Sequence, residues 1–301
     1  MGKLALLFPG QGSQYVGMGR ALYEASPAAR AVFEEADAVL RFALSRLCFE
    51  GPEEELKRTA NTQPAILTHS IAAWRDLQAR FPERIEAAAF AAGHSLGEYS
   101  AEVAAGALSF ADALRLVRQR GLFMQEAVPA GVGAMAAIVG LPPEEVEAAC
   151  KEAAREEVVS PANFNSPEQT VIAGHAAAVA RACAACTARG AKRAIPLPVS
   201  APFHCSLMAP ARERLRPLLE EVPFADAGIP VVTNVDARSE SRGDLLRDAL
   251  LRQVDSPVRW VESVRLLARE GVDRALEIGP GNILSGLVRR IEKGIKAENH
   301  G

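Results

Sequence analysis

The most informative stretch of the sequence is residues 93–97, which read Gly-His-Ser-Leu-Gly. A small apolar run, residues 87–92, precedes it, and residues 99–105 after it favour a helix. A strand, a Gly-x-Ser-x-Gly turn and a helix in this order are typical of a nucleophile elbow, where the glycines relieve crowding and the hydroxyl of Ser95 is exposed at the end of the strand. The alternative is an ordinary glycine-rich turn, so the interpretation needs a base and a substrate site elsewhere in the chain.

A serine nucleophile needs a base to take its proton, and His204 is the best candidate among the five histidines. It follows a strand-like run, in a loop that begins with Pro202, which suits a base. The alternative is a surface histidine without a role. Of the remaining histidines, His69 lies in a helical stretch, and His94 directly precedes the serine and should point away from it. His175 lies at the start of an alanine-rich helix, and His300 lies in a polar tail over residues 293–301.

A serine esterase of this design would also carry an acidic residue between the serine and the histidine in chain order. The acidic residues in that interval fall mostly in helical segments or in an inserted segment. The sequence therefore offers no convincing acid to orient His204. A carbonyl oxygen can hold the imidazole in the same way and gives a weaker base.

Arg120 carries the most information about the substrate. Residues 109–128 favour a helix that begins with an approximate capping box. At about 100° per residue, Arg120 falls near the middle of an apolar arc formed by Phe110, Ala113, Val117, Met124 and Ala127. A guanidinium on an inward face must find an anion. That anion is either a carboxylate of the protein or a substrate carboxylate held by two parallel hydrogen bonds.

Composition and charge describe a globular protein with no reason to bind nucleic acid. Of the 301 residues, 49% are hydrophobic and 24% are charged, and the net charge is −3. The chain contains no run of about 18 apolar residues that would predict a membrane helix. The apolar part of the first ten residues is too short for a signal peptide. We therefore expect a cytoplasmic protein, and a monomer.

The cysteines predict reduced thiols, because they are odd in number and scattered: Cys48, Cys150, Cys183, Cys186 and Cys205. Cys183 and Cys186 form a Cys-x-x-Cys within a helical run, but no second pair of ligands follows, so we expect no metal site there. Gly10 and Gly12 lack the third glycine of a dinucleotide fingerprint. We expect neither a metal nor a tightly bound cofactor.

Strand-like runs alternate with helical segments along most of the chain, which predicts an α/β fold with a largely parallel sheet. The runs are residues 4–8, 87–92, 194–199, 231–235 and 274–278. Ligands bind at the carboxyl ends of the strands in such sheets. Turn-rich segments are expected at these ends, at residues 9–14, 93–97 and 279–282.

Residues 130–197 interrupt this pattern. They favour a strand, a helix, two strands, a second helix and a last strand, which is the βαββαβ order of a ferredoxin-like domain. We expect this small domain to be inserted into a larger, discontinuous α/β domain made of residues 1–129 and 198–301.

Taken together, the motifs resemble those of the malonyl-CoA:acyl carrier protein transacylases of bacterial fatty acid synthesis. The resemblance covers nearly the whole chain, and the joint occurrence of the motifs in order is far more specific than any one of them. It rests on Leu-Phe-Pro-Gly-Gln-Gly-Ser-Gln at 7–14, Gly-His-Ser-Leu-Gly-Glu-Tyr at 93–99, Arg-Gln-Arg-Gly at 118–121, Asn-Phe-Asn-Ser-Pro at 163–167, Pro-Phe-His-Cys at 202–205, Gln253 with Pro-Val at 257–258, and Gly-Pro-Gly at 279–281.

The resemblance implies a role for each motif residue. Ser95 would carry the acyl group, and His204 would act first as base and then as acid, oriented by the backbone carbonyl of Gln253. Backbone amides would form the oxyanion hole, and they would come from Gln11 and Leu96. Arg120 would hold the malonyl carboxylate, and the further substrate-binding residues would be Met124, Asn163, Asn165 and Phe203.

The implied function is transfer of the malonyl group from malonyl-CoA to the phosphopantetheine thiol of acyl carrier protein, through a malonyl-serine intermediate. Lys192 and Arg193 are candidates to contact the acyl carrier protein. Three alternatives stay open: an acyltransferase of polyketide synthesis with another extender unit, a serine hydrolase with the same elbow, and a non-catalytic carrier-binding subunit. A hydrolase predicts a carboxylate behind His204.

Overall fold

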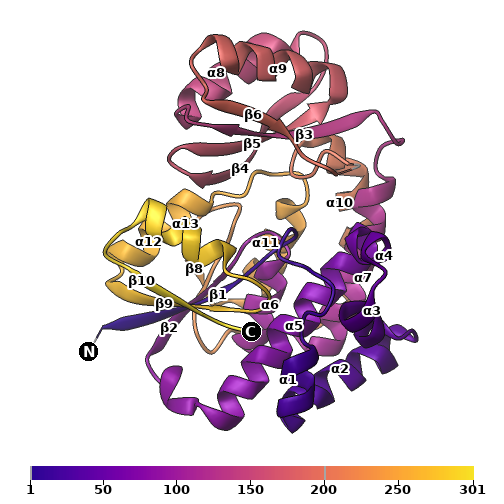
Figure 1. Ribbon diagram of the computed structural model, residues 1–301, viewed down its shortest axis with the longest axis vertical. Helices are drawn as coiled ribbons and strands as arrows, with labels where there is room; N and C mark the ends of the chain where they lie inside the picture. Colours follow the sequence, from indigo (N-terminus) through magenta and orange to yellow (C-terminus); the bar gives the residue numbers. More distant parts are fainter. Residues whose placement is uncertain (1, 200) are drawn as a thin grey trace.

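The computed structural model describes residues 2–199 and 201–301, which form two sheets with helices around them (Figure 1). The larger sheet has six strands in the order β10-β9-β1-β2-β7-β8. Neighbouring strands are parallel except for β7 and β8, which confirms the predicted α/β fold with a mostly parallel sheet. The strands are β1 (Lys3–Phe8), β2 (Ala88–Gly93), β7 (Val231–Val232), β8 (Ser239–Glu240), β9 (Val272–Ile278) and β10 (Lys296–His300).

The polar tail expected over residues 293–301 is wrong in its last part, because Lys296–His300 forms the edge strand β10 and pairs with β9. Only Ala297 of this strand is buried, so the sequence lacks the apolar alternation that predicts a strand. Backbone hydrogen bonds to β9 need no apolar side chain, and polar residues suit an exposed edge. The His300 imidazole is not free in solvent either, since its Nε2 lies 3.1 Å from Asp76 Oδ2.

The smaller sheet has four antiparallel strands in the order β4-β5-β3-β6. Its elements follow the predicted strand–helix–strand–strand–helix–strand order, and residues 194–199 contribute only a short strand to this sheet and none to the larger one. Both helices lie on the face away from the larger sheet (Figure 1). The elements are β3 (Gly133–Val139), α8 (Pro143–Ala154), β4 (Val159–Ser166), β5 (Gln169–His175), α9 (Ala176–Ala188) and β6 (Arg193–Pro196).

The remaining helices surround the larger sheet, and several of them pack together on the side where α5 lies (Figure 1). Those nearest the elbow are α5 (Thr59–Arg80), α6 (Gly97–Ala104), α7 (Phe110–Glu126) and α11 (Gly243–Gln253). The others are α1 (Arg20–Ala25), α2 (Pro27–Leu40), α3 (Leu44–Glu50), α4 (Glu53–Lys57), α10 (Ala209–Glu221), α12 (Trp260–Arg269), α13 (Ile283–Ile291) and the 3₁₀ turns η1 (Pro82–Arg84) and η2 (Ser206–Met208). In the part of the chain that the structure describes, no helix is both long enough and apolar enough to cross a bilayer.

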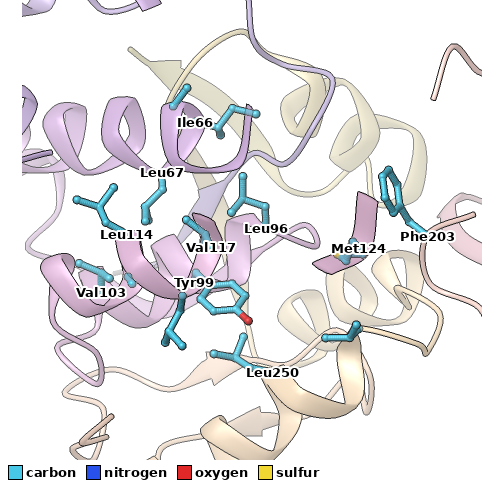
Figure 2. Packing of buried hydrophobic residues seen from close by; sticks show 14 of the residues in the cluster. Ile66, Leu67, Leu96, Tyr99, Val103, Leu114, Val117, Met124, Phe203 and Leu250 are labelled. Atoms are coloured by element: carbon cyan, nitrogen blue, oxygen red, sulfur yellow. The ribbon is translucent and has the colours of Figure 1, made fainter. Parts of the chain in front are cut away.

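One apolar core joins α5, α6 and α7 and thereby positions the elbow (Figure 2). Full burial of a Val, Leu, Ile or Met side chain stabilises the fold by about 1.5–3 kcal/mol. The core reaches the active-site side of α7 at Met124. The same packing therefore fixes the position of α7 relative to the turn after β2. Its members include Ile66, Leu67, Leu96, Tyr99, Val103, Leu114, Val117 and Met124.

Candidate active site

The strand, turn and helix predicted around Ser95 are confirmed: β2 ends at Gly93, and α6 begins at Gly97. Ser95 has a φ of 52°, in the left-handed region that residues with a side chain rarely adopt. A Cβ on Gly93 would lie 1.9 Å from the carbonyl carbon of Gly97, and a Cβ on Gly97 would lie 2.0 Å from the carbonyl oxygen of Phe8. These neighbours are backbone atoms, so the turn requires glycine at both positions.

Ser95 and His204 are separated by 109 residues in the chain but are in direct contact. Ser95 Oγ lies 2.7 Å from His204 Nε2, and His204 Nδ1 lies 3.0 Å from the backbone oxygen of Gln253. Because a carbonyl oxygen only accepts, Nδ1 carries the proton and Nε2 is free to accept the hydroxyl proton of Ser95. The group behind the imidazole is a carbonyl and not a carboxylate, which disfavours the serine hydrolase.

The imidazole of His204 is buried and uncharged. Burial, and to a smaller extent the positive charge of Arg120, lower its pKa to about 3, although the hydrogen bond to the Gln253 carbonyl acts in the opposite direction. A neutral imidazole is the form that can accept a proton, so His204 is available as a base across the neutral pH range.

Arg120 points into the same site from α7. Its side chain is buried (1% exposed), and its Nη2 donates to Ser95 Oγ at 3.1 Å and to Gln253 Oε1 at 2.9 Å. Nη1 donates to Gln63 Oε1 at 2.8 Å. All of its hydrogen-bond partners in the described part of the chain are neutral groups. The alternative of a direct ion pair with an internal carboxylate is therefore not what the structure contains.

The other two arginines of α7 face elsewhere, as the helical arc predicts. Arg115 is exposed and pairs with Asp112, whose amide is capped by Ser109. Arg118 is half-buried and donates to the backbone oxygen of Ala60. Of the three, only Arg120 contacts Ser95.

A cavity of about 120 Å³ opens above Ser95 and contains most of the predicted site residues. Those that line it are Gln11, Ser95, Arg120, Met124, Asn163, Phe203 and His204. Five further lining residues were missed: Gln63 on α5, His94 in the elbow, Met135 on β3, and Leu197 and Val199 beyond β6. Apolar residues on the smaller sheet side carry no periodicity that marks them as lining. Gln63 follows Thr62, another buried polar residue of α5, so its polarity alone does not mark it either.

The backbone amides of Gln11 and Leu96 are free to donate. Neither has a backbone or side-chain acceptor within residues 2–199 and 201–301, and Leu96 is the N-cap of α6. Unpaired N–H groups beside a nucleophile are what the oxyanion of an acyl transfer reaction requires.

Asn165 lies outside the cavity lining, unlike Asn163. Its Oδ1 is 2.8 Å from His94 Nε2, and the ring of His94 packs edge-on against Trp260. The ring of His94 is thus held by Asn165 and Trp260, and His94 lines the same cavity as Ser95.

Asn234 is a further residue that sequence reasoning missed. It follows β7, and its side chain brackets the elbow: Oδ1 accepts from the backbone amide of Ser95 at 2.6 Å, and Nδ2 donates to the backbone oxygen of Gly93 at 2.7 Å. A polar residue at the carboxyl end of a parallel strand is a usable signal, which could have found it.

Two other motifs of the sequence carry no ligand chemistry in the described part of the chain. The amides at the start of α13 are already occupied, because both oxygens of Glu277 accept from Leu284 and Ser285. Cys183 and Cys186 are free thiols on α9. Among the described residues, no group of three or more His, Cys, Asp or Glu side chains is arranged to hold a metal ion.

Comparison with known proteins first defines the class. The family model of the acyl transferase domain matches residues 5–300, nearly the whole chain. The malonyl CoA-acyl carrier protein transacylase of Escherichia coli strain K12 is 54% identical over 291 residues, covering 97% of this chain and 93% of that protein. The enzyme of the same name from Bacillus subtilis strain 168 is 50% identical over 297 residues, covering 98% and 92%.

Solved structures agree. An acyl carrier protein S-malonyltransferase from Vibrio cholerae superposes with a TM-score of 0.95 at 50% identity, over 99% of this chain and 96% of that one. A malonyl-transacylase in complex with a type II PKS acyl-carrier protein gives the same TM-score and identity, over 99% and 95%. The chain therefore belongs to the malonyl CoA-acyl carrier protein transacylase family.

Proposed function

We propose that this enzyme transfers a malonyl group from malonyl-CoA to the phosphopantetheine thiol of an acyl carrier protein, with Ser95 carrying the malonyl group between the two thiols. The observation that carries the proposal is the contact of Ser95 Oγ with both His204 Nε2, at 2.7 Å, and Arg120 Nη2, at 3.1 Å. A base and a carboxylate-binding cation meet at one hydroxyl, which suits an acyl group that ends in a carboxylate.

In the first half of the proposed reaction, His204 Nε2 takes the hydroxyl proton as Ser95 Oγ attacks the thioester carbonyl. The oxyanion is held by the free amides of Gln11 and Leu96, and loss of one such donor typically slows acyl transfer by about 10²–10³-fold. The carbon–sulfur bond then breaks, and His204 returns the proton to the departing coenzyme A thiolate. In the second half, the phosphopantetheine thiol attacks malonyl-Ser95 by the same steps and restores the free hydroxyl.

The substrate improves the base in this scheme. The charge of Arg120 is one of the causes that lower the pKa of His204. A malonyl carboxylate on Arg120 neutralises that charge, so the pKa of His204 rises toward its ordinary value and the imidazole becomes a stronger base. An acetyl group has no carboxylate and does not provide this assistance.

The remaining assignments belong to the same proposal. Residues 130–197 form a ferredoxin-like domain inserted in the core of residues 1–129 and 198–301, and the cleft between them keeps water from the acyl-serine. Asn163, Met124 and Phe203 line the acyl and coenzyme A side, which their position in the cavity supports. The enzyme acts as a cytoplasmic monomer without a metal or tightly bound cofactor. The exposed residues Lys192 and Arg193 contact the acyl carrier protein.

The decisive experiment is to incubate the enzyme with malonyl-CoA alone and locate the adduct by peptide mass spectrometry. We expect one malonyl group on Ser95, none in Ser95→Ala, and its loss from the wild type when acyl carrier protein is added. Malonyl recovered on another residue, or as free malonate at the same rate without any thiol, contradicts the proposal, and the latter result supports the serine hydrolase.

A further inference from the structure

Glu98 is a buried carboxylate beside the active site that the proposed mechanism leaves without a task. It lies three residues after Ser95 on α6 and is fully buried (0% exposed). Its Oε2 accepts two hydrogen bonds, from the backbone amide of Asn234 at 2.9 Å and from the side-chain amide of Gln253 at 2.7 Å. Burial of a carboxylate costs free energy unless the carboxylate is hydrogen-bonded, so these two donors are what stabilise Glu98 in the core.

Gln253 links Glu98 to Arg120. Its Nε2 donates to Glu98 Oε2 and, at 3.0 Å, to the backbone oxygen of Ser95, while its Oε1 accepts from Arg120 Nη2 at 2.9 Å. If the amide were turned around, its NH₂ group would face the guanidinium, donor against donor. The acceptors on Glu98 and on the backbone of Ser95 therefore fix which way the amide of Gln253 points, and with it whether Arg120 Nη2 meets an oxygen of this amide.

Arg120 and Glu98 attract each other without direct contact, since a neutral amide lies between them. A carboxylate bound directly to the guanidinium would have to be displaced by substrate, and a charged hydrogen bond is roughly twice as strong as a neutral one. The amide of Gln253 is a weaker competitor. Arg120 is thus held in place by groups that a substrate carboxylate can replace.

The two hydrogen bonds do not depend on the charge of Glu98. The pKa of Glu98 is raised to about 7, because burial outweighs the bonds from Gln253 and Asn234 and the charge of Arg120, which lower it. Both bonds end on Oε2, and Oε1 has no partner among the described residues. A proton on Oε1 therefore leaves both hydrogen bonds intact.

We propose that Glu98 is a positioning residue that acts through the amide of Gln253 to hold Arg120 in the orientation that binds the carboxylate of the acyl substrate. This inference rests on the proposed function, because it assigns the malonyl preference to a residue that never contacts the substrate.

The test compares transfer of malonyl and acetyl groups from their coenzyme A thioesters to pantetheine, in wild type and in two variants of Glu98. Glu98→Gln keeps an oxygen that can accept both hydrogen bonds, so the ratio of malonyl to acetyl kcat/KM should stay within about threefold of wild type. Glu98→Met has a similar length and no such acceptor. It should lower the ratio by about tenfold or more, as expected when the charged hydrogen bond from Arg120 to Gln253 is lost.

Glu102→Met is the matched control, because Glu102 is four residues further along α6, is equally buried, and has carboxylate oxygens without hydrogen-bond partners among the described residues. It should leave the ratio unchanged. Gln253→Met removes the linking amide and keeps the backbone carbonyl that orients His204, so it should lower the ratio as Glu98→Met does. The double variant should be no worse than the more damaging single one, because both changes break the same link.

A folded Glu98→Met enzyme with the wild-type ratio overturns the proposal, and so does a Glu98→Gln enzyme that loses as much as Glu98→Met. If Glu98→Met does not fold, Gln253→Met decides: a lowered ratio beside an unchanged Glu98→Gln supports the inference, and an unchanged ratio overturns it. Failure of the wild type to form malonyl-Ser95 is a separate result, which removes the proposed function itself.

Discussion

At the scale of single residues, the site is defined by how the charge of Arg120 is held. Its guanidinium is buried, and its partners in the described chain are the neutral oxygens of Ser95, Gln63 and Gln253. A buried cation of this kind gains more from a carboxylate than from amides and hydroxyls, because a charged partner repays more of the desolvation cost. The site therefore favours an acyl group that ends in a carboxylate.

Arg120→Ala should reduce malonyl transfer by about 100-fold or more and acetyl transfer much less, since two charged hydrogen bonds of about 1.5–3 kcal/mol each are lost only for malonyl. The measurement is kcat/KM for both coenzyme A thioesters with the same thiol acceptor. Arg118→Ala is the control on the same helix, because Arg118 contacts the backbone oxygen of Ala60 and not Ser95. Equal losses for malonyl and acetyl in Arg120→Ala would remove the proposed role.

At the scale of elements, the elbow depends on the close approach of three segments. β1 ends at Phe8, β2 ends at Gly93, and α6 starts at Gly97, so close to Phe8 that there is no room for a methyl group. Asn234 closes the turn from the far side by bonding to both of its ends. The serine is held in its unusual backbone conformation by contacts from several elements and not by its local sequence alone.

Gly97→Ala should lower the free energy of unfolding by about 1–3 kcal/mol, because the added methyl group collides with backbone atoms that have no space to move. It should also reduce acylation of Ser95, since α6 must shift. Both effects can be measured, by denaturant titration and by malonyl labelling.

Gly286→Ala is the matched control, a helical glycine whose added Cβ meets nothing within 4 Å. It should raise the free energy of unfolding by about 1 kcal/mol through helix propensity. A Gly97→Ala protein as stable and as active as wild type would show that the close approach is not a constraint.

At the scale of the whole molecule, the two ends of the chain meet in one sheet. β1 and β10 both pair with β9 (Figure 1), and His300 of β10 reaches the end of α5 at Asp76. His69, in the middle of α5, is buried, and neither ring nitrogen has a hydrogen-bond partner in the described chain. Burial, with a smaller contribution from the nearby His300, lowers the pKa of His69 to about 4.

The free energy of unfolding should therefore decrease as the pH is lowered below 7, and His69 should cause part of this decrease. Between its ordinary pKa of 6.5 and about 4, the unfolded chain binds a proton at this residue that the folded chain does not, so the free energy of unfolding decreases as pH falls. From pH 7 to pH 5, wild type should lose about 2 kcal/mol more than His69→Leu. Denaturant unfolding of both proteins at the two pH values measures the difference, and equal losses would contradict it.

The sequence alone identified the elements that have a strong local pattern. The strands β1, β2 and β9 were found because central parallel strands buried on both faces leave continuous apolar runs. The helix α7 was found because burial of one face imposes a periodicity. The elbow was found because its glycines are required by the local backbone. Strand β10 was missed, since an edge strand held by backbone bonds leaves no such pattern.

By itself, the sequence determined the chemistry: a serine in a tight turn, a histidine after a strand, and an arginine on an inward helix face. Only the tertiary structure decided that these three side chains meet at one hydroxyl, and that Asn234, Gln253 and Glu98 connect them. Residue types and local spacing are written in the chain, whereas a hydrogen bond between residues more than a hundred positions apart depends on how whole elements pack.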